Sequence, residues 1–184
     1  NLEQHCKKKS IYYNYILLLD MLMKSFEEIL KKNNINFIRK SIKTLQVNMG
    51  KLCNQACMHC HVEAGPKRTE IMDITVIKKI LSLLKKKNDI KVVDITGGAP
   101  ELNKNFKFFI QELRKLKLKV IDRCNLTVLH EKGQENTALF LSKNKVSITA
   151  SLPCYTQQNV EEQRGKGVFN KSIESLKKLR SEEH

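Results

Sequence analysis

The sequence has no apolar run long enough to cross a membrane. Its longest candidate, residues 16–23, is far shorter than the roughly 20 apolar residues that a spanning helix needs. The sequence also has no signal-peptide pattern, and its six cysteines lack the even, loop-rich spacing of small secreted disulfide domains. These absences argue against a membrane protein and against a disulfide scaffold.

Acidic residues are few beside the basic ones, 19 against 34, and the net charge is +15. Clustered Lys and Arg neutralise phosphates, so this excess is compatible with nucleic-acid binding. Here, however, almost all of it is Lys, scattered over predicted helix faces and accompanied by many Asn. We therefore expect a solvated basic surface and no nucleic-acid partner.

The 184 residues are enough for one domain with a core of its own. Residues 1–42 are predicted to be an N-terminal helical extension, with a helix in residues 11–32 that packs on the main fold. Its apolar positions have helical spacing: Ile16, Leu19, Met23, Phe26 and Leu30. Because the chain starts with Asn1 and not Met, we expect its start to be processed or missing.

Strands and helices alternate over residues 43–184. The predicted strands cover residues 44–48, 92–96, 118–122 and 146–151. A helix over residues 73–87 has Asp73 as its N-cap and an apolar face formed by Val76, Ile77, Ile80, Leu83 and Leu84. Further helices are predicted around residues 106–116, 136–142 and 169–179. Such alternation with short connections predicts an α/β fold with a parallel sheet and right-handed crossovers.

Three cysteines in one short run, CNQACMHC, are the most informative feature. Cys53, Cys57 and Cys60 can wrap three thiolates around one face of a cubane cluster, and four cysteines would complete a closed electron-transfer site. With no obvious fourth cysteine nearby, one iron is left open to bind a reacting molecule. We therefore predict a 4Fe–4S cluster.

Two other interpretations of these cysteines stay open. A zinc site could add His61, but structural zinc sites usually split their ligands into two pairs a dozen or more residues apart. Unreactive buried cysteines are the second, although Asn54, Gln55 and His59 argue against an apolar setting.

The unusual residues all follow predicted strands. CNQACMHCH, TGGAPE, DRCN and SLPCY come after the first, second, third and fourth strand. In barrel-type α/β folds the carboxyl ends of parallel strands meet at one rim, where the chemistry gathers. The four loops are therefore expected to build one pocket.

CxxxCxxC after the first strand, with Gly-Gly and an acidic residue after the second, resembles the radical S-adenosylmethionine superfamily. The resemblance implies that an open iron chelates S-adenosylmethionine and that one electron from the reduced cluster cleaves it to a 5′-deoxyadenosyl radical. It assigns Cys53, Cys57 and Cys60 to the cluster. It assigns S-adenosylmethionine contacts to His59, Gly97, Gly98, Glu101 and Ser151. The less favoured alternative for Gly97-Gly98 is a plain turn, and Ser151 could equally be a plain strand end.

A narrower resemblance covers about residues 45–179. LQVNMGKLCNQACMHCHVEAGPKR, VVDITGGAPELN, VIDRCNLTVL, SLPCY and NVEEQRGKGVFNKSIESLKKL look like the arsenosugar-biosynthesis radical S-adenosylmethionine, Cys-rich family. The implied reaction is 5′-deoxyadenosylation of a trivalent dimethylated arsenical. Since soft arsenic prefers thiolates, Cys124 and Cys154 become candidate catalytic residues that hold this small-molecule substrate. The alternative is that both are small buried side chains. Asp122, Arg123 and Asn125 are expected to line the same pocket, and Tyr155 and Arg164 are weaker candidates.

The chain departs from the superfamily pattern in length. Only four of an expected six strand–helix units can be counted, so residues 43–184 are predicted to be a partial radical S-adenosylmethionine barrel, and we expect a fragment. Two other functions stay open: an RNA-modifying radical enzyme and a non-catalytic cluster-binding remnant. The oxygen-sensitive cluster implies a one-electron donor and a reducing, cytoplasmic setting, with an organelle as the alternative.

Overall fold

The computed structural model describes residues 25–38 and 40–182, which fall into two units that divide between Ser41 and Ile42. In the first unit, helix α2 (Phe26–Lys32) begins with a capping box: Ser25 accepts from the Glu28 amide, and the Glu28 carboxylate accepts from the Ser25 amide. The predicted helix of residues 11–32 is thus present from Phe26 onward, and its earlier part lies outside the described residues.

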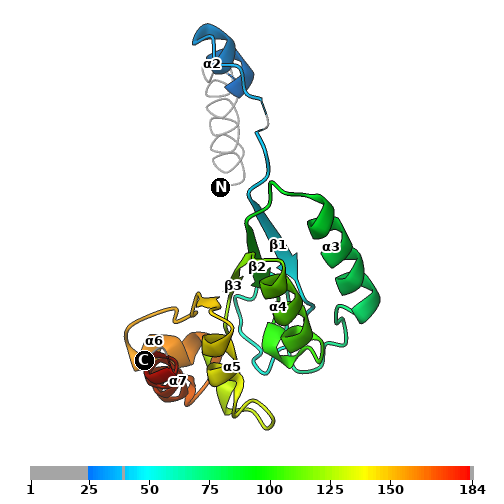
Figure 1. Ribbon diagram of the computed structural model, residues 1–184. Coiled ribbons are helices and arrows are strands. Elements are labelled where there is room, and N and C mark those ends of the chain that lie inside the picture. The colour runs from blue at the N-terminus through cyan, green and yellow to red at the C-terminus, as the bar shows by residue number, and fades with distance from the viewer. Residues whose placement is uncertain (1–24, 39, 183–184) are drawn as a thin grey trace, which may run out of the picture. The chain divides into compact units, whose positions relative to one another are not determined.

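The second unit is built on a parallel sheet of four strands in the order β1-β2-β3-β4 (Figure 1). The strands are β1 (Thr44–Asn48), β2 (Val92–Thr96), β3 (Lys119–Asp122) and β4 (Ser147–Ile148). This confirms the predicted α/β fold of four strand–helix units. The fourth strand is shorter than the predicted residues 146–151, because only Ile121 and Asp122 of β3 pair with it.

Five helices of this unit are α3 (Ile74–Lys86), α4 (Phe106–Lys115), α5 (Thr137–Lys143), α6 (Gln157–Arg164) and α7 (Val168–Glu182). The predicted cap of α3 is confirmed, since Asp73 accepts from the Val76 amide at 2.9 Å. Three elements were not predicted: α6 and the 3₁₀ turns η1 (Pro100–Leu102) and η2 (Leu126–His130). Short turns and a polar helix have too little apolar periodicity to be found from sequence.

The buried face of α3 differs in part from the predicted one. Ile77 and Leu84 are buried as expected, and Leu81 is buried with them. Val76 and Leu83 are 41% and 62% exposed, so their assignment to this face was wrong. Positions 76 and 83 lie at the sides of the buried stripe formed by residues 77, 81 and 84, so their side chains point away from the sheet.

Two apolar cores position the site. The larger core packs α3 and α4 against one face of the sheet, with Phe109, Ile110 and Val120 fully buried. The smaller core contains Cys53 and Cys124 together with residues of η2, α5 and α7. The cysteine loop is therefore anchored against the C-terminal helices as well as the sheet. None of the helices that the structure describes is both long and apolar enough to span a bilayer.

Candidate functional site: a cysteine loop over the sheet rim

The cysteine loop follows β1 and is closed at its neck by backbone pairing. The Cys53 amide donates to the Gly65 carbonyl at 3.2 Å, and the Gly65 amide donates to the Lys51 carbonyl at 3.0 Å. Inside the loop, a turn brings the Cys60 amide to the Cys57 carbonyl at 3.2 Å. The ends of the loop are thus tied together, and the segment with the three cysteines projects from a fixed base.

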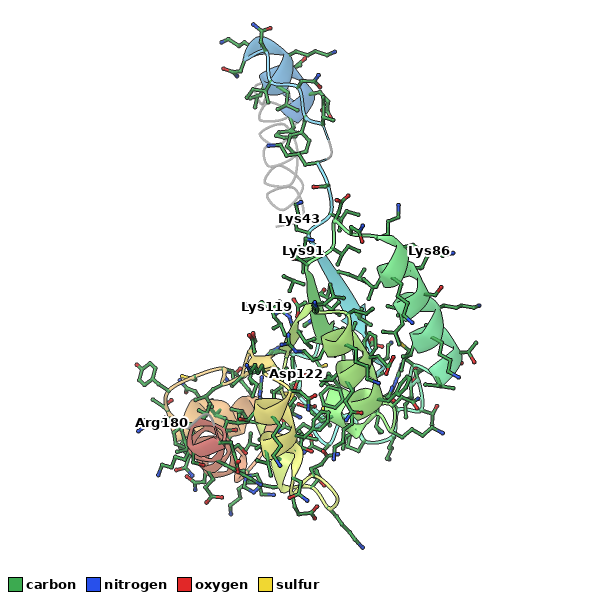
Figure 2. All side chains as sticks on the ribbon, viewed as in Figure 1. Lys43, Lys86, Lys91, Lys119, Asp122 and Arg180 are labelled. Carbon is green, nitrogen blue, oxygen red and sulfur yellow. The ribbon has the colours of Figure 1, made fainter. Side chains whose placement is uncertain are left out.

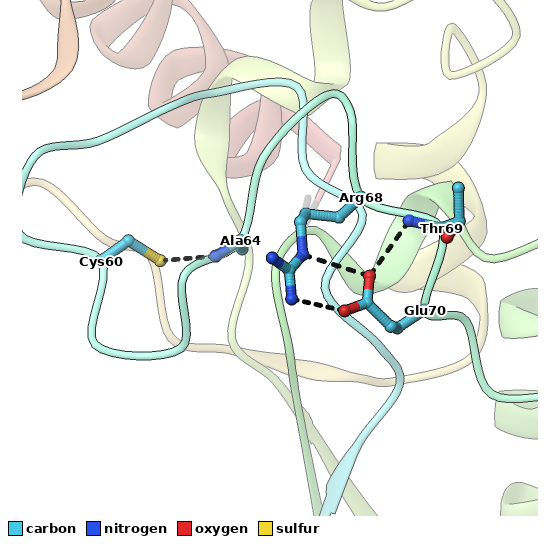
Figure 3. A network of polar contacts seen from close by, with 5 residues as sticks. All are labelled: Cys60, Ala64, Arg68, Thr69 and Glu70. Carbon is cyan, nitrogen blue, oxygen red and sulfur yellow. Dashed lines mark hydrogen bonds and ion pairs between the residues drawn. The ribbon is translucent and has the colours of Figure 1, made fainter.

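Two of the three sulfur atoms accept hydrogen bonds from N–H groups. The Cys53 Sγ accepts from the Gln55 amide and from Asn125 Nδ2, each at 3.4 Å. The Cys60 Sγ accepts from the Ala64 amide at 3.3 Å (Figure 3). Hydrogen bonds to the charged form favour a thiolate, and such bonds to cysteine sulfur set the potential of iron–sulfur clusters.

Figure 3 also shows the return arm of the same loop, where Arg68 and Glu70 form a bidentate ion pair. The Glu70 carboxylate also accepts from the Thr69 amide at 3.1 Å. Because this pair is exposed, its contribution to stability is small, and its role is to shape the arm that leads back to Met72 and α3.

The spacing of the three sulfurs does not suit a single ion. In the described residues, Cys53, Cys57 and Cys60 do not form a group whose ligand atoms all lie within 4.8 Å of one another. Two thiolates on one zinc ion can be at most about 4.6 Å apart, since each Zn–S bond is about 2.3 Å. This arrangement disfavours a zinc ion bound by all three cysteines.

A cavity of about 750 Å³ lies between the cysteine loop and the polar face of the sheet. It brings together most of the predicted site residues, and its lining includes Cys53, Cys57, His59, Cys60, Gly97, Gly98, Cys124 and Ser151. Glu101 and Cys154 are not among the lining residues. The predicted convergence of the four strand-end loops on one pocket is therefore seen in the structure.

Gly97 and Gly98 occupy positions where the backbone approaches the cysteine loop closely. A Cβ on Gly98 would lie 2.4 Å from the Leu52 carbonyl oxygen, and one on Gly97 would lie 2.8 Å from the Gly50 carbonyl oxygen. Gly97 also has φ +149°, a conformation that other residues rarely adopt. The contacts are consolidated by hydrogen bonds from the Gly98 and Ala99 amides to Gly50 and Leu52 at 2.9 and 2.8 Å. Glycine is required here for packing against the loop, and the same two residues line the cavity.

The far wall of the cavity carries a positive charge. Arg164, at the end of α6, donates to the backbone carbonyl and hydroxyl oxygens of Ser151 at 2.7 and 2.6 Å. Burial raises the pKa of the Cys57 thiol, and the nearby Arg164 charge opposes that rise. Arg164 was only a weak candidate from sequence, because α6 was not predicted and so its end could not be placed against Ser151.

A second arginine of the cavity lining, Arg123, is held by an ion pair with Asp94. Arg123 donates through Nε and Nη2 to the Asp94 carboxylate, with the shortest contact at 2.8 Å, and Gln46 donates to the same carboxylate at 3.3 Å. The hydrogen bonds from Arg123 lower the pKa of Asp94. The pair holds Arg123 across β2 and β3 on the polar face of the sheet.

An amide network links the cysteine loop to the segment after β3. Asn125 donates both to the Cys53 sulfur and to Asn54 Oδ1, the latter at 2.7 Å. Asn54 in turn donates to Thr127 and Glu131 at 3.0 and 2.9 Å. The sequence predicted that Asn125 lines the pocket. It did not predict the hydrogen bond to the Cys53 sulfur, because a sequence pattern gives no information about side-chain direction.

Two further cysteines of the described residues, Cys124 and Cys154, have opposite environments. Cys124 is fully buried at the cavity wall, and burial together with two neighbouring acidic groups raises its pKa well above the usual value. Cys154 lies on the loop before α6, where the Thr156 backbone, the Thr156 hydroxyl and Asn159 lower its pKa to about 7. A substantial fraction of Cys154 is therefore thiolate at neutral pH, the reactive form.

The decisive comparison is with protein families: the model of the radical SAM superfamily matches residues 47–183. The chain belongs to the radical SAM superfamily. Membership implies a 4Fe–4S cluster and S-adenosylmethionine as cofactors. The site fits the cluster, because three thiols surround the cavity, two of them with N–H donors, and the Gly97-Gly98 backbone borders the same space.

Individual relatives cover parts of this radical SAM chain. "Putative peptide biosynthesis protein YydG" of Bacillus subtilis is 30% identical over 73 residues, 40% of this chain and 23% of that protein. A "Probable GTP 3',8-cyclase" of Pyrococcus abyssi is 27% identical over 112 residues, 59% of this chain and 35% of that protein. The crystal structure of Streptococcus suis SuiB bound to S-adenosylmethionine matches with a TM-score of 0.62 and 20% identity, over 95% of this chain and 42% of that chain.

The last match shows a shared fold, a partial radical SAM barrel. The chain spans less than half the length of each of these relatives. The names of the first two relatives concern peptide biosynthesis and GTP cyclisation, so they do not point to one common substrate.

Proposed function

We propose that this chain forms the cofactor-binding part of a radical SAM enzyme that adenosylates a trivalent dimethylated arsenical. The observation that carries the proposal is the presence of the cluster-type cysteine loop and a further thiol, Cys124, in the lining of one cavity. When bound, the reduced cluster and S-adenosylmethionine supply a 5′-deoxyadenosyl radical. The protein residues bind, orient and enclose the reactants.

The cluster roles are assigned by position. Cys53, Cys57 and Cys60 bind three irons, while Asn125 and the backbone amides of Gln55 and Ala64 stabilise two of these thiolates. These hydrogen bonds hold the sulfurs in the direction of the cavity. They also limit the movement of the loop when the cluster changes charge.

S-adenosylmethionine is proposed to occupy the cavity between the glycines and Arg164. Gly97 and Gly98 present backbone without side chains, so the methionine end can approach closely. Arg164 is held by Ser151 at the cavity wall and provides a cation for the carboxylate of the cofactor. His59 lines the same cavity and supplies a ring against which the adenine can pack. Glu101 does not line the cavity, so any contribution from it is indirect.

The arsenical part of the proposal rests on the sequence motifs and on thiol chemistry. Trivalent arsenic is soft and prefers thiolates. Cys124 provides a thiol in the cavity lining, and Cys154 provides a more acidic thiol on the neighbouring strand-end loop. Cys154 is proposed to capture the arsenical and Cys124 to hold it near the cofactor.

The test uses cluster-reconstituted protein in three steps. S-adenosylmethionine should change the electron paramagnetic resonance spectrum of the reduced cluster, and 5′-deoxyadenosine should then form. Adding dimethylarsinous acid should yield an adenosylated arsenical, detected by mass spectrometry. A Cys57→Ala variant should lose all three signals, because one iron ligand is missing.

Each of three other outcomes would favour a different function. A changed spectrum and 5′-deoxyadenosine without an arsenical product would reject the arsenical and keep the radical SAM activity. Absence of both signals in protein with a full cluster would favour a non-catalytic, cluster-binding role for this chain. 5′-Deoxyadenosine formation that depends on added RNA would favour the RNA-modifying alternative.

A further inference from the structure

Behind the cavity wall lies a closely packed group of three ionisable side chains, Glu101 of η1, Asp122 at the end of β3 and Cys124 (Asp122 is labelled in Figure 2). One ligand atom from each lies within 4.8 Å of the other two. Glu101 is 4% exposed, and the other two are completely buried. Cys124 alone of the three lines the cavity.

The carboxyl groups of Glu101 and Asp122 are buried with little to stabilise a negative charge on both of them. All four carboxylate oxygens of Glu101 and Asp122 are buried without a hydrogen-bond partner among the described residues. Arg123, the next residue along the chain from Asp122, is bound to Asp94. A pair of ionised carboxylates in such a place would be strongly unfavourable, so the pair must hold a proton or a cation.

Bound protons can neutralise the Glu101–Asp122 pair without a metal cation. A protonated Asp122 can donate to Glu101, and the Cys124 thiol can donate to the same carboxylate, so that the three groups satisfy one another. Burial raises the pKa of Glu101 to about 7. Burial, the Glu101 charge and the more distant Asp94 charge raise the pKa of Asp122 well above its usual value. The pair is therefore expected to hold at least one proton near neutral pH, with Glu101 as the group that titrates there.

We propose that Glu101, Asp122 and Cys124 form a buried proton-transfer site in which Glu101 accepts the Cys124 thiol proton as the sulfur binds a soft electrophile in the cavity. Asp122 is the positioning residue that orients the Glu101 carboxylate. The identity of the electrophile as a trivalent arsenical rests on the proposed function. With dimethylarsinous acid an As–S bond forms and the As–O bond breaks. Glu101 passes the thiol proton to the departing hydroxide, which leaves as water, and nothing is oxidised or reduced.

The proton content of the site can be measured without any arsenical. Infrared spectra of the cluster-reconstituted protein in H₂O and D₂O should show the carbonyl band of protonated carboxyl groups at pH 6. Part of the band should disappear by pH 8.5 as Glu101 ionises, and the part due to Asp122 should remain. Glu101→Gln should remove the titrating part and Asp122→Asn the other part. Glu112→Gln is the control and should leave the band unchanged, since Glu112 is a partly exposed carboxylate of α4 that pairs with Lys115.

Two results, one from the infrared spectra and one from metal analysis, would overturn the proposal. The first is the absence of a protonated-carboxyl band throughout this pH range. The second is a stoichiometric metal other than iron in the wild-type protein that is lost in Glu101→Gln, which would mean that a cation neutralises the pair.

Proton transfer is tested by the rate of dimethylarsinous acid binding in a Cys154→Ser background, where Cys124 remains. Positioned proton transfer typically contributes at least about 100-fold. We therefore expect Glu101→Gln to slow binding about 100-fold and to abolish its pH dependence near neutrality, while Glu112→Gln changes neither. Equal rates in the wild type and Glu101→Gln would refute proton transfer and leave the arsenical function standing.

If Cys124 binds no arsenical at all, the arsenical function fails separately. The site is then judged by the reaction of Cys124 with methyl methanethiosulfonate, a neutral electrophile that forms an S–S bond and releases methanesulfinate. The same 100-fold difference between the wild type and Glu101→Gln, measured at Cys124 by peptide mass spectrometry, supports the proton-transfer site. Equal rates reject it.

Discussion

At the scale of single residues, we expect Asn125 to influence the reduction potential of the proposed cluster. Its amide donates to the Cys53 sulfur at 3.4 Å and is itself held by Thr127, which donates to the Asn125 oxygen at 3.2 Å. A hydrogen bond to a thiolate ligand favours the more negative, reduced cluster. We therefore expect Asn125 to position and tune the proposed cluster without ligating it.

We expect Asn125→Leu to lower the midpoint potential of the cluster by on the order of 60 mV. For one electron this is about 1.4 kcal/mol, comparable with one net hydrogen bond. The measurement is a redox titration followed by electron paramagnetic resonance, with iron content as the control for cluster loss. An unchanged potential at full iron content would show that the Asn125–Cys53 bond does not act on the cluster.

The buried Glu101 carboxyl makes the stability of the folded protein depend on pH. Its pKa is raised in the folded protein from 4.5 to about 7, so the folded state binds more protons than the unfolded state between these values. The contribution to stability is therefore complete below pH 4.5 and is lost as the pH rises to about 7, by an amount on the order of 3 kcal/mol.

We expect Glu101→Gln to remove most of this dependence. Urea denaturation at pH 5.5 and pH 8 should show a loss of stability for the wild type and a smaller loss for the variant. Glu112→Gln should behave like the wild type. A wild-type free energy of unfolding that rises across this interval would contradict the raised pKa.

At the scale of elements, the site depends on how closely the loop after β2 packs on the loop after β1. The Gly98 position leaves no room for a side chain, since a Cβ would meet the Leu52 carbonyl oxygen at 2.4 Å. Gly65 lies in the cysteine loop itself, and a Cβ there would find its nearest neighbour at 4.0 Å, in ordinary contact. The two glycines provide a matched pair.

Gly98→Ala should displace the cysteine loop and reduce stability by about 1–3 kcal/mol, the usual cost of overpacking. Iron incorporation should fall with it. Gly65→Ala should leave both quantities nearly unchanged. The measurements are the iron content per chain after reconstitution and a denaturation curve for each variant. Equal iron incorporation in the two variants would show that the close approach at Gly98 is not needed for cluster binding.

Prediction from sequence was most successful where apolar periodicity is strong. The bounds of β1 and β2 were predicted without error, and the strand-end loops were correctly expected to share one pocket. The burial of Glu101 was not predictable, because a carboxylate in a strand-end loop is usually exposed, whereas the η1 turn buries this one. Side-chain direction in a short turn depends on tertiary packing that no linear pattern contains.

For the molecule as a whole, the distribution of charge bears on the RNA alternative. Lys43, Lys91 and Lys119 are exposed and lie side by side at the start of β1, β2 and β3, where backbone bonds join neighbouring strands (Figure 2). This basic edge is the amino end of the sheet, while the cysteine loop follows the carboxyl end of β1. An RNA substrate bound there would lie away from the cofactor cavity.

We therefore expect that RNA offered to the protein in vitro is held at these lysines by charge alone, without sequence preference and without a link to the chemistry. Replacing all three by Ala should reduce the slope of log affinity against log salt by about 2, since each phosphate contact to a single strand contributes about 0.7. Formation of 5′-deoxyadenosine should be unchanged, because no residue of the cavity is altered. Loss of 5′-deoxyadenosine formation in the triple variant, at full iron content, would instead tie RNA binding at the amino edge to the reaction and revive the RNA-modifying function.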